Sequence, residues 1–330
     1  MSSCSIAVVI PVRNRPQIIA RAIAAAAAQT HPVSEIIVVD DASTDNTPAC
    51  VAALAARDPR IRLVTLPQRV GAPLARNHGA AAATSDLLAF LDSDDGWRPT
   101  KLARQVALLN AIPDAPAAFT AISYRYPDRP AYDSKPPSVV NLPDLFPCNV
   151  LGTCSTALVR RSAFERIGGF IPDLPSCQDW ELWLRLAELG PLPVATEPLT
   201  DYFYDDAGRI SRSTAAVLDG HRKVHGMILA RIANPARRRA IEVEHLRGLA
   251  VLLSRRTYAP AQALSHAAAA LRARPDAANA RLLAETALRV ALEPLVLPAF
   301  RALRQGTRPR STAIPSAGAP ETELARANRS

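Results

Sequence analysis

The chain has 330 residues, of which 48% are hydrophobic, 21% charged and 5% aromatic. This apolar content is enough for a folded core, so a wholly disordered protein is excluded. The net charge of +9 is uneven: residues 1–208 carry 18 basic and 22 acidic residues, whereas residues 209–330 carry 21 and 8. A mildly acidic part is therefore followed by a strongly basic one, a difference that bears on partners rather than on fold.

Several classes of protein are disfavoured by simple features of the sequence. No run of about 18 apolar residues occurs, which argues against a transmembrane helix. The first 15 residues, MSSCSIAVVIPVRNR, place the apolar run before the positive charges, unlike a secretory signal. The five cysteines are odd in number and scattered, which argues against a disulfide framework. We therefore expect a cytoplasmic protein.

Strands and helices alternate in the first part of the chain. Strands are expected at 6–11, 35–40, 61–66 and 87–91, and helices at 16–29, 48–57, 72–83 and 99–109. The continuous apolar run EIIVVD at 35–40 is typical of a strand buried on both faces. This alternation predicts an α/β fold with a mostly parallel sheet flanked by helices.

The pattern then changes along the chain. Residues 125–150 are rich in proline and polar groups and are expected to form an irregular crossing segment, followed by a helix over 179–189. From residue 214 only helices are expected, at 214–233, 236–255, 260–273 and 277–293. We therefore divide the chain into an α/β domain over 1–213, a helical region over 214–306 and a disordered tail over 307–330.

Acidic residues follow two of the expected strands. Asp40 and Asp41 end the second strand, and Asp92 and Asp94 come after the fourth. Open parallel sheets bind ligands at the carboxyl ends of their strands, so we expect these four carboxylates in one crevice. Carboxylates that close repel each other, and a divalent cation such as Mg²⁺ or Mn²⁺ relieves the conflict. The alternative is that the DSDD segment caps a helix.

Five motifs occur in one order and carry a family resemblance. They are VVIPVRN at 8–14, IIVVDDASTDNT at 36–47, GAPLARNHG at 71–79, AFLDSDDGW at 89–97 and QDWELWLRL at 178–186. Together they resemble the family 2 glycosyltransferases over about residues 5–205. The resemblance implies a GT-A fold and inverting transfer of a sugar from a nucleotide-sugar donor to an acceptor hydroxyl, in cell-surface glycan or polysaccharide biosynthesis. Uracil is the base that the family favours, although thymine and guanine also present a ring N–H.

The resemblance assigns a base-binding slot to four residues. It implies that Asp41 accepts a hydrogen bond from a ring N–H of the base, and that Arg76 donates to a base carbonyl. Pro11 and Arg13 line the same slot. An ionised carboxylate only accepts and an imide N–H only donates, so the first pairing is chemically sound. In the alternative interpretation Asp41 caps the following helix and Arg76 lies on a surface helix face.

The resemblance also assigns a metal site to the DSDD segment. Asp94 matches the direct ligand of Mn²⁺ or Mg²⁺, and Asp92 and Ser93 lie near the ribose and diphosphate. The cation would neutralise charge that builds on the departing nucleoside diphosphate. Asp95 either contacts hydroxyls of the donor sugar or caps the helix that Pro99 opens.

Asp179 matches the aspartate that the family uses as its catalytic base. An aspartate with an ordinary pKa of about 3.9 is ionised at pH 7 and ready to take the acceptor proton. The first acid of the family's usual Glu-Asp pair is replaced by Gln178. Glu181 is the competing base, and helix capping is the alternative role of Asp179. Trp180 either floors the acceptor site or packs in the core.

A second departure from the family lies near residue 205. The frequent Tyr-Arg-x-His pattern, whose histidine sometimes joins the metal, is replaced by Tyr202-Phe203-Tyr204-Asp205-Asp206, with Ser211 and Ser213 beyond it. Asp205 is an alternative oxygen ligand. Cys148, Cys154 and Cys177 lack any zinc spacing, so burial is their expected role.

Other function classes fit the sequence less well than an active glycosyltransferase does. A nucleotide-dependent dehydrogenase is disfavoured because no G-x-G-x-x-G follows the first strand. A basic nucleic-acid-binding or scaffold protein has only Tyr258 and Phe300 after residue 208 to stack on bases, so no nucleic acid is expected. An inactive transferase homologue is disfavoured because Asp41, Asp94 and Asp179 are all present.

The basic second part suggests a membrane contact. Residues 295–300, LVLPAF, form a short apolar patch that is followed by Arg301, Arg304, Arg308 and Arg310. Apolar residues beside arginines suit a peripheral contact with anionic lipid. Family relatives often use a glycan or lipid-linked acceptor at the inner membrane face, which makes this contact functionally reasonable. The alternative is that the helices pack on the catalytic domain and leave their arginines in solvent.

Overall fold

The computed structural model describes residues 4–127, 130–204, 213–255 and 259–306, with side chains as far as Ala291. By contacts the chain divides into two compact units, Met1–Thr286 and Ala287–Ser330. The expected disordered tail, Asp205 and Ser211 lie outside the described residues, as do the side chains of the expected membrane patch.

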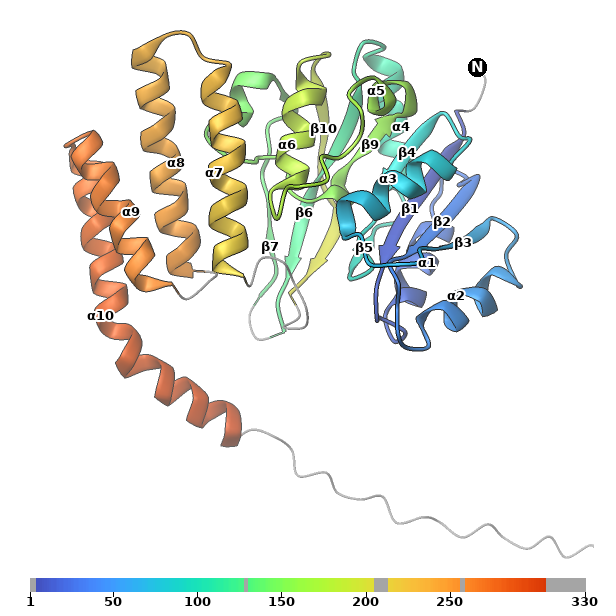
Figure 1. The fold of residues 1–330 in the computed structure, drawn as a ribbon, viewed down its shortest axis with the longest axis horizontal. Coiled ribbons are helices and arrows are strands. Elements are labelled where there is room, and N and C mark those ends of the chain that lie inside the picture. Colours follow the sequence, from blue (N-terminus) through green and yellow to red (C-terminus); the bar gives the residue numbers. More distant parts are fainter. Residues whose placement is uncertain (1–3, 128–129, 205–212, 256–258, 307–330) are drawn as a thin grey trace, which may run out of the picture. The chain divides into compact units, whose positions relative to one another are not determined.

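A sheet of ten strands runs through the described part of the first unit (Figure 1). In spatial order these are β3 (Ile61–Thr65), β2 (Glu35–Asp40), β1 (Ile6–Val12), β4 (Leu87–Phe90), β9 (Leu158–Arg160), β6 (Ala117–Arg125), β10 (Leu192–Phe203) and β5 (Asp95–Trp97). Two short strands lie off this path: β7 (Tyr132–Asp133) pairs with β6, and β8 (Val139–Val140) pairs with β10.

The sheet is parallel in its first half and mixed in its second. β1 pairs in parallel with both β2 and β4, and β2 with β3. Beyond β4, β9 is antiparallel to β4 and β6, while β10 is parallel to β6. The α/β fold class is confirmed, and the parallel arrangement that we expected holds for the four strands on which it was based.

Helices cover both faces of the sheet. They are α1 (Ile19–Ala27), α2 (Thr47–Ala55), α3 (Ala72–Ala82), α4 (Lys101–Ala111), α5 (Arg161–Arg166) and α6 (Gln178–Ala187), with short 3₁₀ turns η1 (Leu142–Leu145) and η2 (Cys154–Thr156). Alternate residues of β1 separate the two faces, because Val8 packs in the cluster that holds α1, α2 and α4, and Val9 in the cluster that holds α3, α5 and α6. On α3, a Cβ at Gly79 would lie 2.4 Å from Val9 Cγ1, so this helix meets β1 without a side chain between them.

Two long strands were absent from the sequence-based expectations. β6 reads AAFTAISYR, and its three alanines weaken the β signal. β10 contains Pro193 and Pro198, and its pairing with β6 shifts register around Pro198. Both are central strands of the second half, so tertiary pairing overrides local propensity there.

Four helices follow the sheet, as expected. They are α7 (Thr214–Ala230), α8 (Pro235–Arg255), α9 (Pro260–Ala273) and α10 (Ala277–Gly306). On α10, Arg281 Nε lies 2.7 Å from Glu285 Oε1, and both side chains are exposed. None of the described helices is long and apolar enough to span a membrane.

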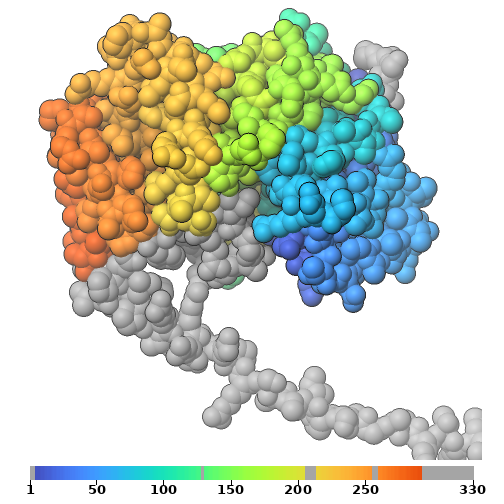
Figure 2. Space-filling model, viewed as in Figure 1, coloured from blue at the N-terminus to red at the C-terminus, as the bar shows by residue number. Residues whose placement is uncertain are grey.

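Helix α7 packs directly on the start of α6. Ser176 Oγ donates a hydrogen bond to the carbonyl oxygen of Ala216 at 2.9 Å. A Cβ at Gly220 would lie only 2.1 Å from the same Oγ, so only glycine permits this approach. Figure 2 shows α7, in yellow, against the green segments that include α6. Our boundary at residue 213 thus separates two kinds of secondary structure, while by contacts residues 214–286 belong to the first unit.

Candidate functional site

A pocket with a volume of about 1440 Å³ opens at the carboxyl ends of β1, β2 and β4. It is larger than the roughly 300–1,000 Å³ of a usual small-molecule site, so it has room for two substrates. The ten residues that the sequence assigned to the site all line it: Pro11, Arg13, Asp41, Arg76, Asp92, Ser93, Asp94, Asp95, Asp179 and Trp180. The strand-end rule therefore located the pocket correctly.

Asp41 organises the turn that leads into α3. Its Oδ1 accepts the backbone N–H of Val70 at 2.6 Å and its Oδ2 accepts that of Gly71 at 2.9 Å. The turn needs glycine at 71, where φ is +86°. Asp41 does not cap α2, whose N-cap is Asn46, so the capping alternative is wrong.

Asp40 does not lie in the crevice, so this part of the prediction is wrong. Its side chain is fully buried, Oδ2 accepts the backbone N–H of Ser43 at 3.2 Å, and it does not line the pocket. Successive residues of an extended chain point to opposite sides, so Asp40 and Asp41 are directed apart.

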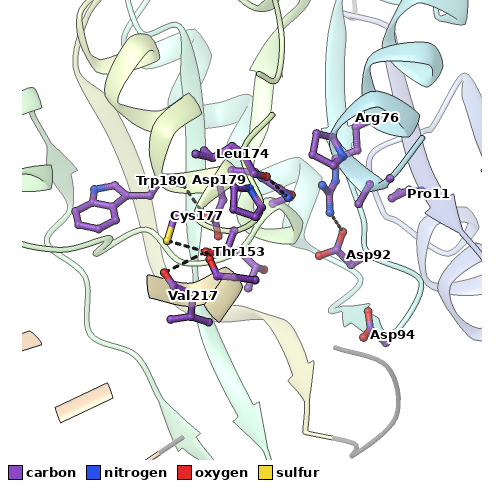
Figure 3. Close-up of a pocket in the computed structure, with 18 of the residues that line it drawn as sticks. Pro11, Arg76, Asp92, Asp94, Thr153, Leu174, Cys177, Asp179, Trp180 and Val217 are labelled. Carbon is purple, nitrogen blue, oxygen red and sulfur yellow. Dashed lines mark hydrogen bonds and ion pairs between the residues drawn. The ribbon is translucent and has the colours of Figure 1, made fainter. Parts of the chain in front are cut away.

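Arg76 forms a buried ion pair with Asp92 inside the pocket (Figure 3). Only 5% of Arg76 is exposed, so the surface-helix alternative is wrong. Its guanidinium carbon lies 5.4 Å from the centre of the Phe170 ring. Burial by itself lowers the pKa of Arg76, but Asp92 together with the other acidic groups nearby, Asp179 among them, outweighs burial, and the net pKa is raised. Nε and Nη1 find no hydrogen-bond partner among the described residues, so both can donate to a ligand.

The turn from Asp92 to Asp95 is held by Ser155 of η2, a residue that no sequence motif singled out. Ser155 Oγ accepts the backbone N–H of Asp92 at 3.0 Å and donates to Asp95 Oδ2 at 2.7 Å. Its carbonyl oxygen accepts Trp97 Nε1–H at 2.8 Å. Asp95 lies in β5 and α4 begins later, at Lys101, so neither Asp95 nor the DSDD segment caps that helix.

Asp94 contacts two arginines of the segment that leads into and through α1. Its Oδ2 is 2.8 Å from Arg15 Nη1, and its carbonyl oxygen accepts a hydrogen bond from Arg21 Nη2 at 2.8 Å. Arg15 and Arg69 also line the pocket, although neither was predicted from the sequence as a site residue. Positive charge therefore surrounds the acidic turn, as an anionic ligand requires.

Asp179 lies in the first turn of α6 and lines the same pocket. Burial raises its pKa to about 6, the N–H of Trp180 and the charge of Arg76 act to lower it, and Asp92 acts to raise it. The Trp180 N–H reaches Asp179 Oδ1 at 2.7 Å, while the N-cap of α6 is Cys177. A carboxyl group with a pKa near the working pH is suited to general-base catalysis.

Glu181, the competing base, is committed elsewhere. Its carboxylate pairs with both Nε and Nη2 of Arg185, at 2.6 and 2.5 Å, and it does not line the pocket. Arg185 in turn donates to the carbonyl oxygens of Ile167 and Gly169. Glu181 therefore holds the turn before α6 and does not face a substrate.

Part of the chain matches the model of a known protein family. The family model described as Glycosyl transferase family 2 matches residues 7–168, which contain all the lining residues of the pocket from Pro11 to Cys154. Residues 7–168 of the chain belong to glycosyl transferase family 2.

Curated relatives of this family 2 chain include three bacterial proteins. A putative teichuronic acid biosynthesis glycosyltransferase of Bacillus subtilis is 33% identical over 164 residues, which are 49% of this chain and 64% of that protein. A succinoglycan biosynthesis protein of Rhizobium meliloti is 45% identical over 103 residues, 31% of this chain and 29% of that protein. A UDP-Glc:α-D-GlcNAc-diphosphoundecaprenol β-1,3-glucosyltransferase of Escherichia coli is 29% identical over 210 residues, 62% of this chain and 79% of that protein. The chain thus spans less than two thirds of the first two.

Solved structures share the fold. S. aureus TarS (residues 1–349) in complex with UDP-GlcNAc superposes with a TM-score of 0.62 at 17% identity, covering 82% of this chain and 81% of that one. A mannosyltransferase of Pyrobaculum calidifontis in complex with GDP-Man and Mn²⁺ gives a TM-score of 0.56 at 22% identity, covering 88% and 81%. At these identities the likeness shows the GT-A fold alone.

The residues of the family 2 chain fit a divalent cation. Asp92 and Asp94 place hard carboxylate oxygens on the pocket wall. No group of three or more His, Cys, Asp or Glu among the described residues could hold a metal by itself. A Mg²⁺-like ion that takes one or two carboxylates and completes its shell with phosphate and water fits this arrangement.

Trp180 contributes to the wall of the pocket mainly by packing. Only 2% of it is exposed, and its Nε1–H is donated to the carbonyl oxygen of Leu145 at 2.8 Å. Its ring lies 5.6 Å from that of His221 on α7. This burial favours the core interpretation over an open plate for the acceptor. Ser213 caps α7 by accepting the N–H of Ala216. The five cysteines are free thiols, and Cys154 is buried as expected, whereas Cys148 is exposed, so the expected burial is wrong for Cys148.

Proposed function

We propose that the protein is an inverting, metal-dependent glycosyltransferase that transfers a hexose from a UDP-sugar to an acceptor hydroxyl in cell-surface polysaccharide biosynthesis. The observation that carries this proposal is the occurrence in one pocket of the Arg76–Asp92 pair and of Asp179, a carboxyl group with a pKa of about 6. Relatives named for teichuronic acid biosynthesis (putatively) and for succinoglycan biosynthesis support the biosynthetic setting.

The donor is proposed to occupy the side of the pocket that is formed by residues 11–95. Asp41 accepts the ring N–H of the base, while Pro11 and Arg13 line the slot. The two unpartnered N–H groups of Arg76 are available to the base carbonyl or to the diphosphate. UDP is favoured because S. aureus TarS, which has the same fold, binds UDP-GlcNAc.

The diphosphate and donor sugar are proposed to lie along the Asp92–Asp95 turn. Asp94 would hold Mn²⁺ or Mg²⁺, with Asp92 and Ser93 next to the ribose and diphosphate and Asp95 next to the donor sugar. The cation, when bound, supplies Lewis-acid stabilisation of the leaving diphosphate. The Mn²⁺ in the structure of the Pyrobaculum relative supports this choice of cofactor.

Asp179 is proposed to act as the general base. It takes the proton of the acceptor hydroxyl, and the oxygen attacks the anomeric carbon of the donor on the face opposite the diphosphate. The bond from that carbon to the diphosphate oxygen breaks, and the nucleoside diphosphate leaves with the electron pair. A single displacement of this kind inverts the anomeric configuration.

The protein is further proposed to work in the cytoplasm, next to the inner membrane face. A glycan or lipid-linked acceptor is supported by the diphosphoundecaprenol substrate named for the Escherichia coli relative. The basic charge of residues 209–330 supports a peripheral contact with anionic lipid. The proposed division into a catalytic domain, a helical region and a tail keeps its boundaries at 213 and 306.

Thermal shift with nucleoside diphosphates tests the proposed function. UDP at about 100 times its Kd should stabilise the fold by roughly 2.7 kcal/mol. We expect Mn²⁺ to enlarge the shift, and Asp94→Ala to abolish the Mn²⁺-dependent part together with transfer, while the free protein melts as before. Asp114→Ala, at an exposed position outside the pocket, is the matched control and should behave as wild type. Near wild-type turnover in Asp94→Ala would show that the metal assignment is wrong.

A further inference from the structure

The two sides of the pocket differ sharply in charge. The side formed by residues 11–95 carries four arginines and four aspartates. The other side, which we call the acceptor half, is formed by the described lining residues between 147 and 252 (Figure 3). Asp179 is the one charged side chain among them. A diphosphate is therefore well matched to the first side, whereas the described lining residues of the second side offer it no cation.

Two polar atoms in the acceptor half have unmet hydrogen-bonding capacity. Thr153 Oγ1 and His221 Nδ1 are buried and find no partner among the described residues. Burial lowers the pKa of His221 to about 4 and that of His245 to about 3, so both rings are neutral at pH 7. A hydroxyl group can satisfy such atoms because it both donates and accepts.

The far wall of the acceptor half is aliphatic. Val217 of α7 and Leu249, Val251 and Leu252 of α8 line it. Val251 is 37% exposed, which is unusual among the large apolar side chains of the described part. Aliphatic surface that faces a substrate cavity stabilises an apolar ligand group by removing it from water.

Helix α7 is a built part of this wall rather than a loose neighbour. Gly220 allows it to contact Ser176, three residues before the proposed base. Lys223 Nζ also donates to the carbonyl oxygen of Asp173 at 3.0 Å. The position of α7 relative to Asp179 is thus set by direct contacts.

We propose that the acceptor half binds an uncharged sugar that carries an aliphatic group. Thr153 and His221 hold hydroxyls of the sugar beside Asp179, and the aliphatic group lies against Val217, Leu249 and Val251. No cation occurs among the described lining residues of the acceptor half, so burying a phosphate or carboxylate against them would be costly. This favours a glycosidic over a phosphodiester link between the sugar and the aliphatic group, unlike the diphosphoundecaprenol substrate named for the Escherichia coli relative. This inference rests on the proposed function, because it needs the acceptor hydroxyl next to Asp179.

Matched acceptors test the inference. We would supply octyl glycosides of glucose, galactose, mannose and N-acetylglucosamine below their critical micelle concentrations, each with its methyl glycoside and its octyl 1-phosphate diester. The octyl glycoside of the preferred sugar should have a KM about tenfold lower than the methyl glycoside, since several buried CH₂ groups are added. The phosphodiester should have a KM about tenfold higher than the octyl glycoside. Equal or better use of the phosphodiester would overturn the proposal. A dialkyl glycoside in neutral vesicles distinguishes a membrane source from a soluble one.

A pair of valines supplies the matched variants. Val251→Asn should raise the KM for the octyl glycoside about three- to tenfold and leave the KM for the methyl glycoside unchanged. Val139 is 38% exposed but lies outside the pocket, so Val139→Asn should change neither. An equal rise for both glycosides in Val251→Asn would contradict an aliphatic subsite.

Binding is also measured without catalysis. Cys148 is an exposed thiol on the acceptor half, and its alkylation by N-ethylmaleimide is followed by peptide mass spectrometry. An octyl glycoside should slow the reaction at least about twofold at saturation, and Cys4 outside the pocket is the internal control. If no octyl glycoside protects Cys148, the proposal that the acceptor half binds a sugar with an aliphatic group is wrong. Failure of nucleoside diphosphates to shift the melting temperature would instead contradict the proposed function.

Discussion

Two carboxylates on α6, only two residues apart, have opposite environments. Asp179 lies in the first turn on the pocket wall, whereas Glu181 is 2% exposed and bound by Arg185. Residues two apart on a helix lie about 200° apart around its axis, so they face different surroundings. Local sequence offers both as bases, and only the pairing with Arg185 separates them.

The base assignment predicts a specific kinetic effect. Asp179→Asn keeps the shape and the hydrogen bond from the Trp180 N–H but loses proton affinity. We expect kcat to fall about 10²–10⁴-fold with donor binding little changed. Glu181→Gln should instead lower the melting temperature, because it weakens a buried ion pair. Mild loss in Asp179→Asn with a large kcat loss in a folded Glu181→Gln would reassign the base.

The raised pKa of Asp179 has consequences for pH dependence. Activity should fall as the pH drops below about 6, because the carboxyl group is then protonated. The sign for stability is opposite: a carboxyl whose folded pKa is raised stabilises the fold at low pH and loses that contribution as pH rises through 6. Asp179→Asn should therefore raise the melting temperature more at pH 8 than at pH 5. An inactive Asp179→Asn variant that shows this pH dependence of the melting temperature is folded.

At the scale of elements, one turn connects the two sides of the pocket. Asn77 of α3 exchanges two hydrogen bonds with the backbone of Phe170, at 2.8 and 2.9 Å. Arg185 of α6 donates to Ile167 and Gly169 in the same turn. Arg76 and Asp179 lie on these two helices, so the turn sets their relative position. The left-handed backbone of Gly169, with φ of +69°, permits this tight path.

Two glycines on α7 provide an element-scale test of docking. Gly220→Ala would place a Cβ 2.1 Å from Ser176 Oγ and should lower the stability by about 1–3 kcal/mol. A Cβ at Gly226 would meet no neighbour within 4 Å, so Gly226→Ala should stabilise the helix by about 1 kcal/mol. Thermal melting compares the two. Equal changes in both variants would show that α7 does not pack on α6 in solution.

At the scale of the molecule, charge is distributed unevenly along the chain. The first 208 residues have a net charge of −4 and the remainder has +13. Part of that positive charge is used internally, since Arg231, the C-cap residue of α7, pairs with Glu188 at 2.6 Å. Exposed arginines such as Arg281 are paired within their own helix. The packing alternative is thus realised for α7, while the patch at 295–300 lies beyond the described side chains.

Liposome co-sedimentation tests the membrane proposal. The full chain should bind vesicles that contain anionic lipid and be released at high salt, because screening weakens the attraction over about 10 Å. Truncation near residue 290 should abolish binding and retain nucleotide-dependent stabilisation. Binding that ignores lipid charge, or that survives truncation, would contradict a contact through this region.

The sequence by itself located the first four strands, the helices between them and ten of the residues that line the pocket. It could do so because strand ends, apolar runs and the five motifs are local patterns, and parallel strands bring their carboxyl ends to one edge. The same logic failed for β6 and β10, whose alanines and prolines give no local signal and whose pairing is long-range.

Only the tertiary structure decided which side chains face the pocket. It directed Asp40 into the core and Asp41 to the cavity, and it brought Ser155 under the acidic turn. It also placed α7 and α8 beside Asp179, more than 30 residues away in the chain. These outcomes depend on packing and hydrogen bonds between distant segments, and such contacts leave no periodic trace in the sequence.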